Sequence, residues 1–239
     1  MADEMARIDE ITRIRVRFSK GDPVRFISHL DLTRAMERAV RRAKLPIAFS
    51  RGFHPMPKIA YASALPVGTT SEAEYADFEF NRPVEAEEVL RRLNSVLPEG
   101  IRILEASRVP ADAGALMAMV DLAEYRVEVV GWPDLSRDRV EEAIGRLLDR
   151  REIPVERRGK KGARVIDLRP LIKEISWQGE DHGRQQITMR LGMGNAGNAR
   201  PEEILESSGL PSAGSGVHRI GLFVTRGETF LSPMELKGR

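Results

Sequence analysis

An alternation of apolar and charged residues opens the first ordered segment of the chain. Every second position from 14 to 18 is apolar, and arginine occupies positions 13, 15 and 17. Successive side chains of a strand point to opposite faces of a sheet. Residues 11–19 are therefore predicted to form a half-exposed β-strand with a row of guanidinium groups on its outer face.

The pattern changes to a helical one after Ser28. Ser28 is followed three positions later by Asp31, which is typical of a helix N-terminus. Apolar residues then recur every three to four positions until Pro46, as expected for an amphipathic helix. The arginines of this segment fall on another face, which we expect to be turned outward.

The remaining pattern in the first half predicts strands at 59–66, 73–80 and 101–107 and a helix at 85–97, which completes the order β-α-β-β-α-β. The second half repeats this order roughly, with strands near 124–130 and 185–192, a hairpin around 158–162, helices at 137–149 and 201–207, and a closing strand at 217–226. We therefore expect an α+β protein of two ferredoxin-like (βαββαβ) domains, whose antiparallel sheets are covered by helices. The expected divisions are a basic domain at 1–110, a linker at 111–119 and a second domain at 120–239.

Composition excludes several classes of site. The chain has no cysteine, so it cannot by itself form a disulfide, a cysteine-ligated zinc site or a cysteine-ligated iron–sulfur cluster. Its four histidines are widely spaced, and we expect no metal and no cofactor in this chain. No run approaches the roughly 20 apolar residues that span a bilayer, and the first ten residues are acidic, which favours a cytoplasmic protein without a membrane partner.

The charges are divided unevenly along the chain. Residues 11–70 contain 12 Lys and Arg against 3 Asp and Glu, whereas residues 71–130 contain 6 against 13. A local cationic excess of this kind favours an anionic partner such as a phosphate backbone. Two alternatives are a solvated helix face, and neutralisation of the basic face by the acidic block.

The candidate contacts lie on the predicted helix and on the Gly- and Pro-containing loop that follows it. For nucleic acid or another anion they are Arg34, Arg38, Arg41, Arg42, Lys44, Arg51, Phe53, His54 and Lys58. Phe53 could stack on a base or pack on the core. A secondary contact is expected at a hairpin tip, from Arg158, Lys160 and Lys161, unless that tip is merely solvated. The sequence singles out no catalytic residue and leaves catalysis open, with a binding role favoured.

One segment resembles a known family. Residues 24–80 read VRFISHLDLTRAMERAVRRAKLPIAFSRGFHPMPKIAYASALPVGTTSEAEYADFEF, which is similar to the signature of the radical SAM-linked proteins, a bacterial family of undetermined activity. The resemblance covers about the first 110 residues. It implies a partnership with a radical S-adenosylmethionine enzyme that carries a cobalamin-binding-type region. A more distant likeness is to the ferredoxin-like CRISPR repeat-associated RNA-binding proteins.

Three functions follow from these observations. The first is a non-catalytic protein that binds RNA, or presents a substrate, for a radical S-adenosylmethionine enzyme, with a structured RNA such as tRNA as the ligand. The second is a protein-only adaptor whose basic face docks on that enzyme. The third is a metal-independent ribonuclease that uses His29 or His54 for proton transfer.

Overall fold

The computed structural model describes residues 11–110, 113–130, 135–159, 162–194 and 197–236. These residues form two compact units. Unit 1 comprises the described residues up to Val120 together with those from Phe223 onward, and unit 2 comprises those from Asp121 to Leu222. The last part of the chain therefore returns to the first unit, whereas the sequence pattern had assigned all of 120–239 to a second domain.

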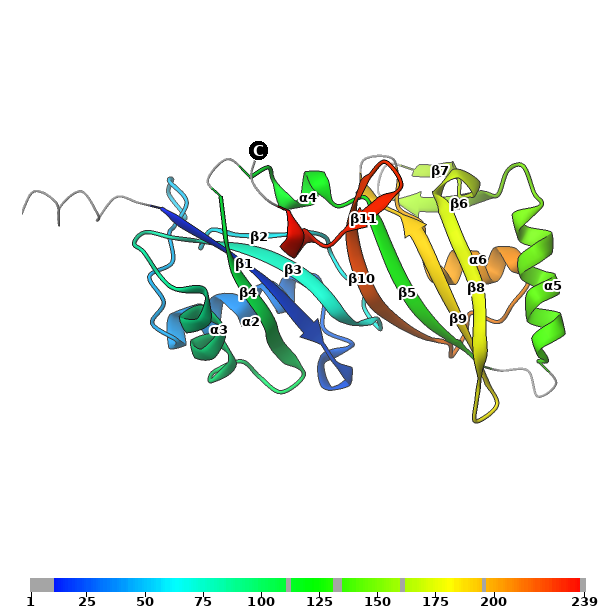
Figure 1. The fold of residues 1–239 in the computed structure, drawn as a ribbon, viewed down its shortest axis with the longest axis horizontal. Helices are drawn as coiled ribbons and strands as arrows, with labels where there is room; N and C mark the ends of the chain where they lie inside the picture. The colour runs from blue at the N-terminus through cyan, green and yellow to red at the C-terminus, as the bar shows by residue number, and fades with distance from the viewer. Residues whose placement is uncertain (1–10, 111–112, 131–134, 160–161, 195–196, 237–239) are drawn as a thin grey trace, which may run out of the picture. The chain divides into compact units, whose positions relative to one another are not determined.

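Unit 1 has the expected order of strands and helices (Figure 1). Its elements are β1 (Thr12–Lys20), η1 (Asp22–Val24), α2 (His29–Arg42), β2 (Ile59–Tyr61), β3 (Thr70–Phe80), α3 (Ala86–Asn94), β4 (Ile101–Val109), α4 (Leu116–Met119), β11 (Thr229–Leu231) and η4 (Pro233–Glu235). The strands are hydrogen-bonded in the order β4-β1-β3-β2, and each of these pairings is antiparallel. Helix α4 lies within the segment that was predicted to be a linker.

The core of unit 1 lies between this sheet and helices α2 and α3. Alternate residues of β1, such as Val16 and Phe18, are fully buried there against Met36 of α2 and Leu93 of α3. The 3.6-residue period of α2 places its apolar residues on one face, so that burial of this face stabilises both the helix and the sheet.

The opposite face of β1 is less exposed than its sequence predicted. Arg15 is only 2% exposed, because the C-terminal residues around η4 cover it. Arg17 keeps partial access to water. The prediction of an open guanidinium row is therefore wrong at its central residue.

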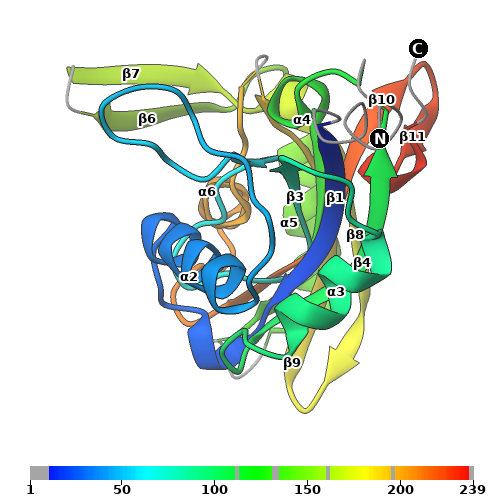
Figure 2. The ribbon, with the colours of Figure 1, turned by 90° about the vertical axis from the view of Figure 1, so that its left-hand side faces the viewer.

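Unit 2 contains a second mixed arrangement of strands and helices. Its elements are β5 (Leu122–Val129), α5 (Arg137–Leu148), β6 (Pro154–Gly159), β7 (Gly162–Asp167), η2 (Arg169–Leu171), β8 (Ile172–Asp181), β9 (Arg184–Gly192), α6 (Pro201–Ser208) and the part of β10 (Gly216–Arg226) up to Leu222. The main sheet has the order β10-β5-β9-β8, with antiparallel β5–β9 and β8–β9 pairs. Strands β6 and β7 form a separate hairpin that projects from the rest of this unit (Figure 2). The chain is thus α+β, with mostly antiparallel strand pairing.

Candidate nucleic-acid interface

Helix α2 is positioned by its cap and by its apolar face. The Ser28 side chain accepts a hydrogen bond from the backbone N–H of Asp31 at 3.1 Å, which satisfies one of the free donors at the helix start. Burial of Leu32, Met36 and Val40 then turns the opposite face to solvent. The predicted helix start is confirmed.

Four of the predicted arginines lie on that exposed face. Arg34, Arg38, Arg41 and Arg42 are all exposed; Arg38 lies four residues after Arg34, and Arg41 and Arg42 lie three and four residues after Arg38. Seven residues of helix advance about 10 Å, so Arg34 to Arg41 form a short cationic row. We call these four residues the α2 stripe.

The α2 stripe keeps most of its charge. Arg34 lies 3.5 Å from Asp31, and both side chains are more than half exposed, so solvent and salt screen this pair. Within the ranges that the structure describes, the side chains of Arg38, Arg41 and Arg42 form no ion pair and no hydrogen bond. An anion can therefore reach these guanidinium groups without displacing a protein carboxylate.

The acidic block of residues 71–130 has other partners. Its ion pairs with side chains outside the α2 stripe are Asp77–Arg15, Glu79–Lys58, Glu88–Arg92, Glu105–Arg17, Glu124–Arg190 and Glu128–Arg184. None of these pairs involves an arginine of the stripe. The acidic block therefore neutralises other cations, and the alternative in which it neutralises the stripe finds no support among the described residues.

A further cation, which the sequence did not single out, joins the end of α2. The guanidinium of Arg92 on α3 donates to the carbonyl oxygens of Ala43 and Lys44, where the helix leaves acceptors unpaired. Lys44 itself has a left-handed backbone (φ 50°) and an exposed side chain. Arg92 lies 48 residues from Lys44, so no local pattern could have indicated this contact.

The loop between α2 and β2 extends away from the helix in Figure 2. Its neck is closed by the Phe49–Pro57 bridge and by a 2.9 Å hydrogen bond from Ser50 N to the Met56 carbonyl oxygen. Arg51, Phe53 and His54 are exposed at its tip, and the Phe53 side chain is fully exposed. The alternative in which Phe53 packs on the core is wrong, and the aromatic ring is available for stacking.

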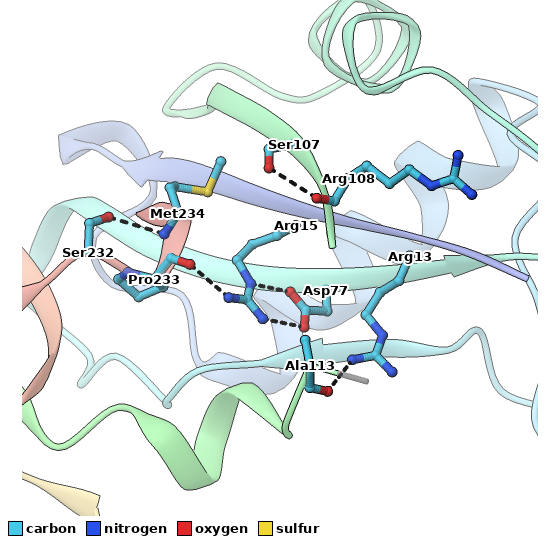
Figure 3. A network of polar contacts seen from close by, with 9 residues as sticks. All are labelled: Arg13, Arg15, Asp77, Ser107, Arg108, Ala113, Ser232, Pro233 and Met234. Atoms are coloured by element: carbon cyan, nitrogen blue, oxygen red, sulfur yellow. Dashed lines mark hydrogen bonds and ion pairs between the residues drawn. The ribbon is translucent and has the colours of Figure 1, made fainter. Parts of the chain in front are cut away.

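A cleft of about 440 Å³ lies at the base of this loop. Lys58 lines it, and its Nζ is 2.7 Å from Glu79 Oε2, so this predicted contact already has a carboxylate partner. Arg13 also lines the cleft and donates to the Ala113 carbonyl oxygen at 2.9 Å (Figure 3). Both cations are thus engaged within the protein, whereas Arg38, Arg41 and Arg42 of the α2 stripe have no partner among the described residues.

The cleft is braced from behind by a buried ion pair. Arg15 Nε and a terminal nitrogen of Arg15 donate to the two Asp77 oxygens at 2.7 and 2.9 Å, and the other terminal nitrogen donates to the Pro233 carbonyl oxygen at 2.7 Å (Figure 3). Asp77 also lines the cleft. Since both partners are nearly inaccessible, the pair fixes the cleft wall and is not itself a ligand contact.

The two histidines considered for proton transfer lie in different environments. The ring of His29 packs edge-on against Tyr61 with 5.1 Å between centroids, and His29 Nδ1 is buried without a hydrogen-bond partner in the described chain. Burial raises the pKa of the Tyr61 hydroxyl, which stays protonated at neutral pH. His54 is exposed at the loop tip.

Among the residues that the structure describes there is no group of three or more His, Asp or Glu that could hold a metal ion.

The predicted secondary contact is only partly described. Arg158 lies on β6, exposed, with its Nε 2.9 Å from Glu156 Oε1. Lys160 and Lys161 lie outside the described residues.

None of the described helices is both long enough and apolar enough to cross a membrane.

Comparison with known proteins gives a family and a distant structural likeness. No curated protein matches the chain. A solved structure described as "Crystal Structure of a Cbf5-Nop10-Gar1 Complex" is similar with a TM-score of 0.44 and 10% sequence identity, over 95% of this chain and 50% of that one. This chain therefore spans about half the length of the chain it resembles. A family model matches residues 13–201, and the chain thus belongs to the family described as "Uncharacterized protein conserved in bacteria (DUF2344)".

Proposed function

We propose that this protein binds RNA without catalysing a reaction and presents it to a radical S-adenosylmethionine enzyme. The observation that carries the proposal is the α2 stripe, in which three of four exposed arginines have no partner in the described chain although the protein is rich in carboxylates. Guanidinium groups in a row bind the phosphates of a nucleic-acid backbone and release its counterions.

The loop at residues 50–58 supplies the second half of the proposed interface. Phosphate contacts position a nucleic acid, whereas contacts with bases distinguish its features. The exposed Phe53 ring offers a stacking surface for an unpaired base, and Arg51 and His54 beside it offer polar contacts. Recognition of unpaired bases beside a phosphate backbone is suited to a structured RNA such as tRNA.

The proposed fold is consistent with this role. The strand order β4-β1-β3-β2 in unit 1 and the order β10-β5-β9-β8 in unit 2 each follow the same permutation, which supports two ferredoxin-like units with the β6–β7 hairpin inserted in the second. RNA-recognition modules use a four-stranded sheet with two helices. The radical S-adenosylmethionine partner, with a cobalamin-binding-type region, rests on the resemblance of residues 24–80. In this proposal the iron–sulfur cluster of the radical enzyme is held by the partner, since a chain without cysteine cannot ligate a cysteine-bound cluster alone.

A binding titration with matched charge reversals tests the RNA proposal. Fluorescently labelled tRNA is titrated with the full chain, with the stripe variant Arg38→Glu/Arg41→Glu, and with the control Arg139→Glu/Arg146→Glu on α5. Both double variants change the net charge equally, and all four arginines are exposed. We expect saturable binding by the wild type and the control, and binding at least tenfold weaker by the stripe variant. The affinity of the stripe variant should also depend less steeply on salt, because each lost phosphate contact removes about 0.7 to 0.9 from the slope of log K against log salt.

The contribution of the loop is tested separately. Phe53→Ala should weaken binding by about 1–3 kcal/mol if the ring stacks on a base, whereas Phe26→Ala, which removes another exposed phenylalanine of unit 1, should have little effect. The proposal fails if the folded wild type shows no saturable binding to tRNA or to total small RNA. In that case the α2 stripe would be assigned to docking on a protein.

A further inference from the structure

A second cationic site lies in unit 2 and includes Arg158, which the sequence predicted as a secondary contact. A cavity of about 650 Å³ opens between the β6–β7 hairpin and the start of α6. Among the described residues its lining includes four arginines and two carboxylates; the arginines are Arg157, Arg158, Arg164 and Arg200. Its volume is in the range of small-molecule sites in proteins.

The hairpin places two of these arginines side by side. Arg157 on β6 is directly opposite Arg164 on β7, so both side chains stand on the same face of the ribbon. Like charges in this position repel each other. Half-buried Val155 and Ile166 form the neighbouring pair on the same face, which shows that this face turns toward the rest of unit 2.

Of the two opposed arginines, Arg157 is neutralised by a carboxylate. Arg157 Nε lies 2.6 Å from Glu203 Oε1 on α6, its terminal nitrogen contacts the other carboxylate oxygen, and each side chain of the pair is 12% exposed. This forked, shielded pair fastens the hairpin to α6. A two-stranded hairpin alone is marginally stable, so the pair also holds the cavity wall in place.

Two arginines of the cavity have no ion pair among the described residues. Arg158 is paired with Glu156, but the side chains of Arg164 and Arg200 form no ion pair or hydrogen bond with any residue that the structure describes. Gly159, Gly162 and Ala163 also line the cavity, so small side chains leave room beside the two guanidinium groups.

We propose that this cavity is a binding site for a phosphate group, held between Arg164 and Arg200. A phosphate ester carries close to two negative charges and three acceptor oxygens, which matches two free guanidinium forks, whereas a carboxylate matches only one. A bound dianion would also supply the counter-charge that Arg164 lacks among the described residues. The inference goes beyond the proposed function, since it involves unit 2 and no residue of the α2 stripe.

The test measures inorganic pyrophosphate binding by isothermal titration calorimetry with the full chain at constant ionic strength. We expect saturable binding by the wild type, weakening of about tenfold or more in Arg164→Gln and in Arg200→Gln, and no change in Arg151→Gln, an exposed arginine outside the cavity. Succinate at the same ionic strength should bind at least tenfold more weakly. Circular dichroism melting confirms that each variant is folded.

The outcome is separable from that of the RNA proposal. Arg38→Glu/Arg41→Glu should bind pyrophosphate like the wild type, even if its RNA binding is lost or never existed. Competition with short RNAs then shows which kind of phosphate the cavity accepts. Displacement of pyrophosphate by an RNA with a 5′-phosphate, but not by the same RNA with a 5′-hydroxyl, identifies a terminal phosphate as the ligand, and equal displacement by both identifies backbone phosphates. Displacement by neither RNA points to a small phosphate ester as the ligand. The inference is overturned if the wild type does not bind pyrophosphate, if succinate binds equally well, or if Arg151→Gln weakens binding as much as the cavity variants.

Discussion

Removal of the Asp77 carboxylate should destabilise unit 1 far more than removal of its neighbour Glu79. Both carboxylates lie on β3 two positions apart, both line the same cleft, and each is paired with one cation. They differ in burial. The Asp77 and Arg15 side chains are 5% and 2% exposed, against 28% for Glu79 and 41% for Lys58.

The expected magnitudes follow from this difference. Asp77→Ala leaves the Arg15 guanidinium buried with a single neutral acceptor, the Pro233 carbonyl oxygen. Loss of one partner of a buried ion pair costs about 3–5 kcal/mol. After Glu79→Ala the Lys58 ammonium, which is already partly exposed, is still solvated by water. The expected loss of unfolding free energy is below about 1 kcal/mol. For a domain of this size each 1 kcal/mol lowers the melting temperature by about 2–4 °C, which gives a shift of roughly 6–20 °C for Asp77→Ala.

Differential scanning calorimetry of the wild type, Asp77→Ala and Glu79→Ala measures these shifts, and hydrogen exchange locates the loosened strands. The double variant Arg15→Met/Asp77→Leu is an internal control, because apolar residues of similar volume should recover much of the lost stability. Exchange should increase in β1 and β3 of Asp77→Ala. Equal melting temperatures for the two single variants would refute the reasoning, since burial would then have no effect on the strength of the pair.

Two further predictions concern a helix cap and a tight turn. A hydrogen bond from the Ser28 hydroxyl lowers the pKa of the Asp31 carboxyl in the folded state. The stability from this contact is therefore present above the ordinary pKa near 3.8 and is lost as pH falls through the lower folded pKa. The difference in melting temperature between the wild type and Ser28→Ala should narrow between pH 7 and pH 2, and an unchanged difference would contradict this prediction. Gly100→Ala should lower the free energy of unfolding by about 1–3 kcal/mol more than Gly183→Ala does. Both glycines have a positive φ, but a Cβ at residue 100 would lie 2.9 Å from the Val24 side chain, whereas a Cβ at residue 183 would meet no atom within 4 Å. Urea denaturation measures both free energies, and equal losses would exclude the steric cause.

Local pattern was enough to predict α2 and its exposed arginines. The cap, the apolar period and the outward face all depend on residues within one or two helical turns, and the structure agrees with each of them. Strand β8 (Ile172–Asp181) was not predicted, because register shifts near Ile172 and Trp177 interrupt the alternation of its side chains. The hairpin at β6 and β7 was predicted, but not the α6 residue that anchors it, since Glu203 is 46 residues from Arg157.

The sequence by itself determined the secondary-structure order of unit 1, the excess of cations before residue 71 and the exclusion of cysteine-ligated metal sites, because these depend on composition and short-range periodicity. It could not indicate which cations are free. Arg15 is buried because residues 218 positions away return to cover it, and Lys58 faces Glu79 because β2 pairs with β3. Glu203 contacts Arg157, so that Arg164 has no carboxylate partner among the described residues. Tertiary structure alone decided these pairings, since the Coulomb energy of two charges depends on their distance in space and on their burial, and not on their separation along the chain.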